Sequence, residues 1–212
     1  MEQLIQQLLV EADKRIKKDD PSHDLDHASR VLSNSRHISS YEGGDLTIIT
    51  PAALFHDVVT YPKDDPRSRK AAYESSLVAG EILSNMDYPR EKIPLVMRAI
   101  VEHSYSAGIR PETLESKIVQ DADRLECTGA IAIMRLFCST GQMKRKFYDF
   151  EDPFCELRYP TGDKCALDFL YKRLLTIGDS MNTETAKRIA KSRTKFLYCF
   201  LEQLKDELAI IK

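Results

Sequence analysis

The 212-residue chain contains no tryptophan, no Cys-x-x-Cys pair and only five histidines. Its five cysteines (Cys127, Cys138, Cys155, Cys165 and Cys199) are odd in number, which argues against a disulfide framework and against a thiolate metal site. No apolar stretch is long enough to span a bilayer, and the first residues lack the basic start of a signal peptide. We therefore expect a cytoplasmic protein with reduced, mostly buried thiols and no membrane segment.

An excess of charge of either sign is also lacking. The chain has 31 Lys and Arg residues against 33 Asp and Glu residues, which gives a formal net charge of −2. This balance offers no global electrostatic reason to bind nucleic acid or a membrane, so neither is expected as a partner. The length fits one domain, and residues 1–212 are expected to form it.

Alternating β-branched runs are missing as well, except for the short LTIIT at residues 46–50. Elsewhere the apolar residues recur at helical spacing, which predicts a compact all-α bundle. Thr50-Pro51 resembles an N-cap followed by the first residue of a helix. Further helices are expected over residues 71–83, 93–101, 118–137, 166–175 and 185–208. Residues 139–164, with two prolines, two glycines and several aromatics, predict an irregular segment that could act as a lid.

Residues 53–59, ALFHDVV, place a histidine and an aspartate side by side in an otherwise apolar run. A buried carboxylate without a partner costs several kcal/mol or more, so Asp57 requires a compensating group, most simply a cation. Because neighbouring residues on a helix differ in direction by about 100°, His56 and Asp57 would converge only on an ion between them.

A helical wheel selects the other inward-facing polar residues. His27 falls on the rim of the apolar stripe of its helix, His103 faces inward, and His37 points away. In the segment KIVQDADRLECTGAIAIMRLF, Asp123 lies near the edge of the buried face, whereas Asp121 and Arg124 are expected to point outward.

Each of these residues also has a purely structural interpretation. His27 could be a hydrogen-bonded core histidine, Asp123 could pair with an arginine, and His23 could serve a loop or capping role. Four inward ligand-type residues on three helices, His27, His56, Asp57 and Asp123, together favour a site for one divalent ion. Nitrogen and oxygen donors without sulfur suit Mn, Fe, Co, Ni or Zn, whereas Mg is less natural for several imidazoles.

The blocks SHDLDHASRVL, AALFHDVVTYPKDDPRSRKAAYESS, AIVEHS and IVQDADRLECTGAIAI resemble those of the HD-domain superfamily of metal-dependent phosphohydrolases. The similarity covers roughly residues 20–208, and the blocks look like those of a bacterial single-domain subgroup. The resemblance implies that His27, His56, Asp57 and Asp123 are the metal ligands. It also implies hydrolysis of a phosphate ester or anhydride in a nucleotide or another small phosphorylated substrate, as by a nucleotidase or a nucleoside triphosphate pyrophosphohydrolase.

Charge that develops on a phosphoryl group must be met by cations, and Lys63 and Arg67 follow the His-Asp pair closely. His103 could protonate a leaving oxygen or hold a phosphate. Two alternatives stay open: a phosphodiesterase or alarmone hydrolase, and a non-catalytic HD domain that senses a nucleotide. A helical surface would also allow a homodimer.

Overall fold

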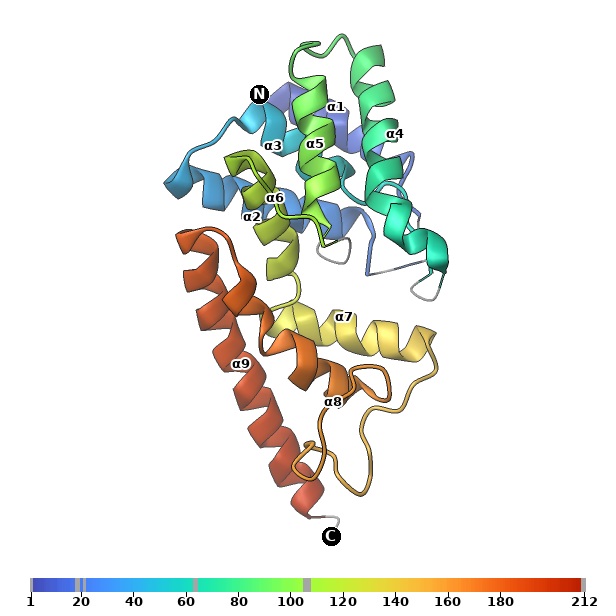
Figure 1. Ribbon diagram of the computed structural model, residues 1–212, viewed down its shortest axis with the longest axis vertical. Coiled ribbons are helices and arrows are strands. Elements are labelled where there is room, and N and C mark those ends of the chain that lie inside the picture. The colour runs from blue at the N-terminus through green and yellow to red at the C-terminus, as the bar shows by residue number, and fades with distance from the viewer. Residues whose placement is uncertain (1, 18–19, 21, 63–64, 105–107, 211–212) are drawn as a thin grey trace. The chain divides into compact units, whose positions relative to one another are not determined.

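The computed structural model describes residues 2–17, 20, 22–62, 65–104 and 108–210 (Figure 1). The chain divides into two compact units, Met1–Asp123 and Arg124–Lys212. The described residues form helices and no strand, which confirms the all-α class. None of the described helices is long and apolar enough to cross a membrane. The organisation of residues 1–212 as one domain stays a prediction.

The first unit contains α1 (Glu2–Asp13), α2 (Leu25–Glu42), α3 (Leu46–Phe55), a short 3-10 turn η1 (Pro66–Lys70), α4 (Ala71–Asn85), α5 (Ile93–His103) and most of α6 (Leu114–Leu125). Helix α3 is its centre, because it packs against α1, α2, α4 and α5. Every residue from 48 to 55 is buried, so α3 is apolar on all sides, as a core helix must be. Burial of this helix places its C-terminal end inside the protein.

The start of α3 corrects the expectation from the sequence. The helix begins at Leu46, and its N-cap is Asp45, whose carboxylate accepts a hydrogen bond from the backbone N–H of Thr47. Lys92 pairs with the same carboxylate at 2.6 Å, and this contact lowers the pKa of Asp45 to about 2. The assignment of Thr50 as N-cap was therefore wrong, and the β-branched LTIIT forms the first part of the helix, because an Asp cap upstream of both starts the helix earlier.

Pro51 consequently lies inside α3 and cannot donate the usual helical hydrogen bond to the carbonyl of Thr47. The hydroxyl of the buried Tyr88 donates to this carbonyl instead, at 2.5 Å. A side chain from the segment between α4 and α5 thus satisfies a backbone group that would otherwise be left unpaired in the core.

The segment 118–137 is not one helix, which corrects a second expectation. Helix α6 ends at Leu125, a turn follows, and α7 (Gly129–Gln142) begins with Gly129 at φ 67°. A single helical wheel therefore loses its register after residue 125, and Met134, expected to be buried, is exposed. Asp121 and Arg124 are buried rather than outward-facing, because residues 118–122 are buried on every side of α6.

The second unit contains α7, α8 (Ala166–Phe169), a π-helical turn η2 (Leu170–Leu174), a 3-10 turn η3 (Ile177–Ser180) and the long α9 (Glu184–Ala209). Its core is built from Ala132, Leu136, Ala166, Leu167, Leu170, Leu174, Leu197 and Leu201. Among the cysteines, only Cys165 is buried and Cys199 is exposed, so the expectation of mostly buried thiols was wrong; all five are free thiols.

The irregular segment begins after Gln142 rather than at residue 139, because α7 continues to Gln142. From residue 143 to residue 165 it has no regular element apart from an isolated bridge between Lys146 and Cys165. The buried carboxylate of Asp168 organises it and accepts two hydrogen bonds from Arg158 at 2.7 Å each. Thr161 adds its backbone N–H and its hydroxyl, each at 3.1 Å. The stretch is therefore tied to α8 by polar contacts; its role as a lid stays a prediction.

Candidate metal centre

The centre of the candidate site is the C-terminal end of α3, where His56 and Asp57 follow the last helical residue, Phe55. His56 is fully buried, and its Nδ1 lies 2.8 Å from the carbonyl oxygen of Ala53. The chain beyond the pair is fixed by Ser75 on α4, whose hydroxyl accepts a hydrogen bond from the N–H of Val59. The apolar run therefore delivers both polar side chains to one position at the edge of the core.

His27 is brought to the same place by the first turn of α2. Asp24 is the N-cap of this helix, and its carboxylate accepts a hydrogen bond from the backbone N–H of His27 at 2.8 Å. Helix α2 is linked to α6 by Asn34, whose amide donates to the carbonyl of Ala122 beside Asp123. The capping bond and the interhelical bond position His27 and Asp123 without involving their own side chains.

Four ligand-type side chains converge here. Nε2 of His27 lies 3.2 Å from Nε2 of His56, and His27, His56 and Asp57 offer ligand atoms that all lie within 4.8 Å of one another. Asp57 Oδ2 is 3.5 Å from His56 Nε2 and 3.9 Å from His27 Nε2. Asp123 Oδ1 is 3.5 Å from His27 Nε2 and 3.9 Å from His56 Nε2.

These distances fit a shared divalent ion. Metal–ligand bonds of about 2.1 Å separate adjacent ligand atoms by about 3.0 Å at right angles and about 3.4 Å in a tetrahedron. The separations between the two imidazole nitrogens and between each of them and each carboxylate, 3.2 to 3.9 Å, begin in this range and extend slightly above it. Two imidazole nitrogens and two carboxylate oxygens form a donor set that suits a divalent transition ion.

The tautomer of His56 follows from its backbone contact. A carbonyl oxygen can only accept a hydrogen bond, so Nδ1 of His56 carries the proton that is donated to Ala53. In the neutral ring, Nε2 then presents its lone pair toward His27 and the two carboxylates. A hydrogen bond from the opposite ring nitrogen to a carbonyl is the usual way in which a metal-binding histidine is oriented.

The electrostatics agree with this arrangement. Burial lowers the pKa of His56, which favours the neutral imidazole that can bind a metal. Burial alone would raise the pKa of Asp57, but the neighbouring imidazoles of His56 and His103 hold this pKa well below its ordinary value. Burial likewise opposes ionisation of Asp123, and His56 and His27 reverse the effect and lower its pKa. Both carboxylates are therefore ionised at neutral pH.

His103, at the end of α5, joins the cluster as the sequence suggested. It is buried, its Nε2 lies 3.6 Å from Asp57 Oδ1, and its ring packs edge to face against that of His56. Burial acts to lower its pKa, but the contact with the Asp57 carboxylate prevails and raises it. The amide of Gln120 on α6 donates to the carbonyl of Glu102, which fixes the end of α5 next to this histidine.

Of the two residues expected to bind phosphate, Lys63 lies outside the described residues. Arg67 is exposed, and its guanidinium forms hydrogen bonds with Asp65 and lies over the ring of Tyr61, 4.6 Å from the centroid. Its phosphate-binding role stays a prediction.

His23, to which the sequence analysis gave a loop or capping role, lies beside the cluster. Its ring packs edge to face against that of His27, with the centroids 5.8 Å apart. Its Nδ1 is 2.8 Å from Asp20 Oδ2, so Asp20 holds the ring. In the sequence, only the position of His23 four residues before His27 indicated that its ring could lie near the site. The contact between His23 and Asp20 could not be predicted, because it depends on the folded turn.

Comparison with known proteins places this site in a family. Residues 24–128, which include all four converging side chains, match the HD domain. YpgQ of Bacillus subtilis is 30% identical over 188 residues, which are 88% of this chain and 84% of YpgQ. The crystal structure of the Lin1889 protein from Listeria innocua has a TM-score of 0.76 and 33% identity, and the alignment covers 100% of this chain and 98% of that one.

Two further structures add chemical information about relatives. An HD-superfamily hydrolase from Bacillus thuringiensis has a TM-score of 0.72 and 30% identity, with 97% of each chain covered. YpgQ has been crystallised in complex with ADP, and that structure has a TM-score of 0.73 and 26% identity, covering 97% of this chain and 95% of YpgQ. Fold, site and similarity together define an HD-superfamily hydrolase. The chain belongs to the HD-domain superfamily, which confirms the resemblance.

Proposed function

We propose that this protein is a metal-dependent phosphohydrolase that cleaves a phosphate ester or anhydride in a nucleotide. The observation that carries the proposal is the convergence of His27, His56, Asp57 and Asp123 from three parts of the helical bundle. The two imidazole nitrogens lie 3.2 Å from each other and 3.5 to 3.9 Å from an oxygen of each carboxylate. These four residues would hold one divalent ion.

A divalent ion bound there would lower the pKa of a bound water toward ~7 and polarise a phosphoryl oxygen. The chain's own contribution is to keep His56 neutral, to keep both aspartates ionised, and to exclude most water by burying the imidazoles. His103 lies against Asp57 with its Nε2 on the side of the cluster. From this position it is suited to donate a hydrogen bond to a phosphoryl or leaving oxygen.

A nucleotide is the proposed substrate class for two reasons. The relative YpgQ binds ADP in its crystal structure, and this chain has similarity to it over most of its length. Within this class, a nucleoside triphosphate pyrophosphohydrolase would release pyrophosphate, whereas a nucleotidase would release orthophosphate. The two activities therefore differ in a product that can be measured directly.

The first experiment measures bound divalent metal in the purified protein by elemental analysis, together with His56→Ala and a matched His37→Gln control. His37 is an exposed histidine of α2 outside the cluster. We expect about one metal per chain in the wild type and in His37→Gln, and loss of the metal in His56→Ala, because the site then lacks one of its two imidazole ligands. Equal metal content in all three proteins would contradict the proposed ligand set.

The second experiment supplies nucleoside mono-, di- and triphosphates with Mn, Co, Ni or Mg and measures orthophosphate and pyrophosphate. Turnover that requires the metal and disappears in His56→Ala is expected. Nucleotide binding without turnover with any of these ions would contradict the enzymatic function and favour a non-catalytic nucleotide-binding domain.

A further inference from the structure

The first two thirds of α9 form a strongly basic stretch of sequence. Residues 185–201 contain five Lys and Arg residues and no carboxylate, although the whole chain has a net charge of −2. Lys187, Lys191 and Lys195 recur every four residues and line one hollow of about 660 Å³. Four helical residues correspond to a rise of about 6 Å, so the three side chains form a row along one face of α9.

The opposite wall of this hollow comes from η3 and from Leu175, which precedes it. Gly178 allows the 3-10 turn to lie close to α9, because a Cβ at this position would come within 3.3 Å of Ala190 Cβ. Leu175, Gly178 and Asp179 line the hollow together with Thr194 and the lysines of α9. The feature is therefore a groove between two elements, unlike the open face of a solvated helix. We refer to it as the α9 groove.

The α9 groove combines cations with an aromatic ring. Its lining holds three lysines against one carboxylate, that of Asp179. Lys187 is bonded to Glu184 at 2.6 Å, whereas the described residues give Lys191 and Lys195 no ion pair. Tyr198 follows at the end of the lysine row, and its side chain is half exposed. A tyrosine ring beside such ammonium groups is suited to a ligand that has both a flat ring and negative charge.

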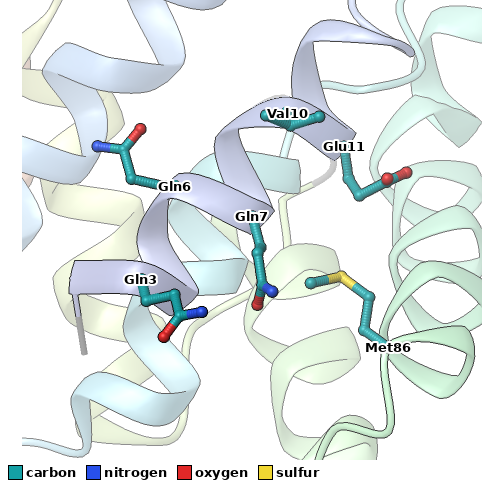
Figure 2. A pocket seen from close by; sticks show the side chains of 6 residues that line it. All are labelled: Gln3, Gln6, Gln7, Val10, Glu11 and Met86. Carbon is teal, nitrogen blue, oxygen red and sulfur yellow. The ribbon is translucent and has the colours of Figure 1, made fainter.

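Two other hollows of the described surface lack this combination. One of about 460 Å³ lies beside α1 (Figure 2) and is lined by amide, apolar and acidic side chains: Gln3, Gln6, Gln7, Val10, Glu11 and Met86. No cation is among these lining residues. Another, of about 570 Å³ next to the start of α5, balances Arg90 against Asp87. Of these three hollows, the α9 groove alone carries an excess of positive charge.

We propose that the α9 groove is a second nucleotide site, with phosphates held by Lys191 and Lys195 and the base stacked on Tyr198. Its volume lies within the range of about 300–1,000 Å³ that is usual for small-molecule sites. All its residues come from 175–198, whereas the proposed metal ligands lie between residues 27 and 123. The groove therefore needs no metal ion and does not depend on the proposed catalytic function.

The test measures ADP binding by equilibrium dialysis in buffer with a chelator, which removes divalent ions and with them any metal-dependent binding. Wild type is expected to keep one saturable site. The Lys191→Gln/Lys195→Gln variant should bind about tenfold more weakly or worse, because two charge-assisted contacts are lost. Arg15→Gln/Arg36→Gln removes the same charge from exposed positions after α1 and in α2, and should change the affinity less than about twofold.

Tyr198 separates a nucleotide from a simple anion. Tyr198→Ala should weaken ADP about fivefold or more and leave binding of inorganic triphosphate unchanged, while Tyr198→Phe should bind ADP as the wild type does. Urea unfolding of each variant checks that it is folded.

Three results would overturn the proposal: no saturable ADP binding by the wild type with chelator, an equal loss of affinity in the arginine control and the lysine variant, or unchanged ADP binding in Tyr198→Ala. The variant His56→Ala should retain this binding. Failure of the metal centre and failure of the α9 groove therefore give different results.

Discussion

The contact between Asp168 and Arg158 offers a sharp test of what holds the irregular stretch from residue 143 to residue 165. The carboxylate of Asp168 is fully buried and accepts two bonds of 2.7 Å from the guanidinium. The change Asp168→Asn keeps the volume and one acceptor oxygen but removes the charge. It leaves Arg158 with a neutral partner that cannot accept both of these bonds in the same way.

The expected cost follows from these contacts. Two charge-assisted hydrogen bonds at about 1.5 kcal/mol each give a loss of about 3 kcal/mol in the free energy of unfolding. This value is at the lower end of the loss of about 3–5 kcal/mol for removing one partner of a buried ion pair. The lower end is appropriate, because the side chain of Arg158 is 24% exposed and water can replace part of the lost contact.

The same contact predicts a pH dependence. The hydrogen bonds from Arg158 hold the pKa of Asp168 far below its ordinary value, although burial acts in the opposite direction. A carboxyl whose pKa is lowered in the folded state binds fewer protons than in the unfolded state. Its stabilising contribution is therefore complete above the ordinary pKa of about 3.9 and is lost as the pH falls from there through the lowered pKa. Asp168→Asn should make the loss of stability in acid shallower.

Urea unfolding of the wild type, Asp168→Asn, Arg158→Met and the double variant measures the coupling between the two residues. Lys164→Met is the matched control, because Lys164 pairs with Asp149 at the same distance of 2.7 Å but is mostly exposed. It should cost less than about 1 kcal/mol. If the losses of the two single variants of the buried pair simply add, the reasoning is refuted.

Two smaller perturbations test how the fold prepares the candidate site. Asp24→Ala should lower the free energy of unfolding by about 1 kcal/mol and weaken metal binding, because the cap fixes the backbone of His27. The control Asp26→Ala, in the same turn, should change metal binding little. Urea unfolding measures the stability of each variant, and metal titration measures its affinity. Tyr88→Phe should cost about 1–3 kcal/mol, because the carbonyl of Thr47 then lacks its donor. Adding Pro51→Ala should recover part of this loss by restoring a backbone N–H, and no recovery in urea unfolding would contradict that account.

Much of the candidate site could be predicted from the sequence, because its ligand-type residues interrupt apolar helix faces. An aspartate within ALFHDVV and an inward His103 are conspicuous without any structure, since burial of such groups demands a partner. The structure adds that Asp57 and His103 are partners of each other, at 3.6 Å. Helical spacing predicts the helix face on which each residue lies. It does not predict the distance between residues on different helices.

Two of the wrong predictions concern the residues at which a helix begins or ends. The start of α3 depends on Asp45, whose carboxylate is held by Lys92 and whose backbone N–H donates to Glu115; both partners are distant in sequence. The turn after Leu125 changed the register of the wheel and exposed Met134. Such boundaries are decided by tertiary contacts, so periodicity alone leaves them open.

His56 and His103 share a local arrangement that has a wider consequence. Each follows or ends a helix, and each donates its Nδ1 proton to the carbonyl oxygen three residues earlier, Ala53 for the first and Ile100 for the second. These carbonyls belong to the last helical turn, where backbone acceptors lack a partner within the helix. The orientation of each imidazole relative to its helix is therefore determined within four consecutive residues. Substitutions in other helices can therefore change how these two helix ends are packed without changing the orientation of either imidazole relative to its own helix end.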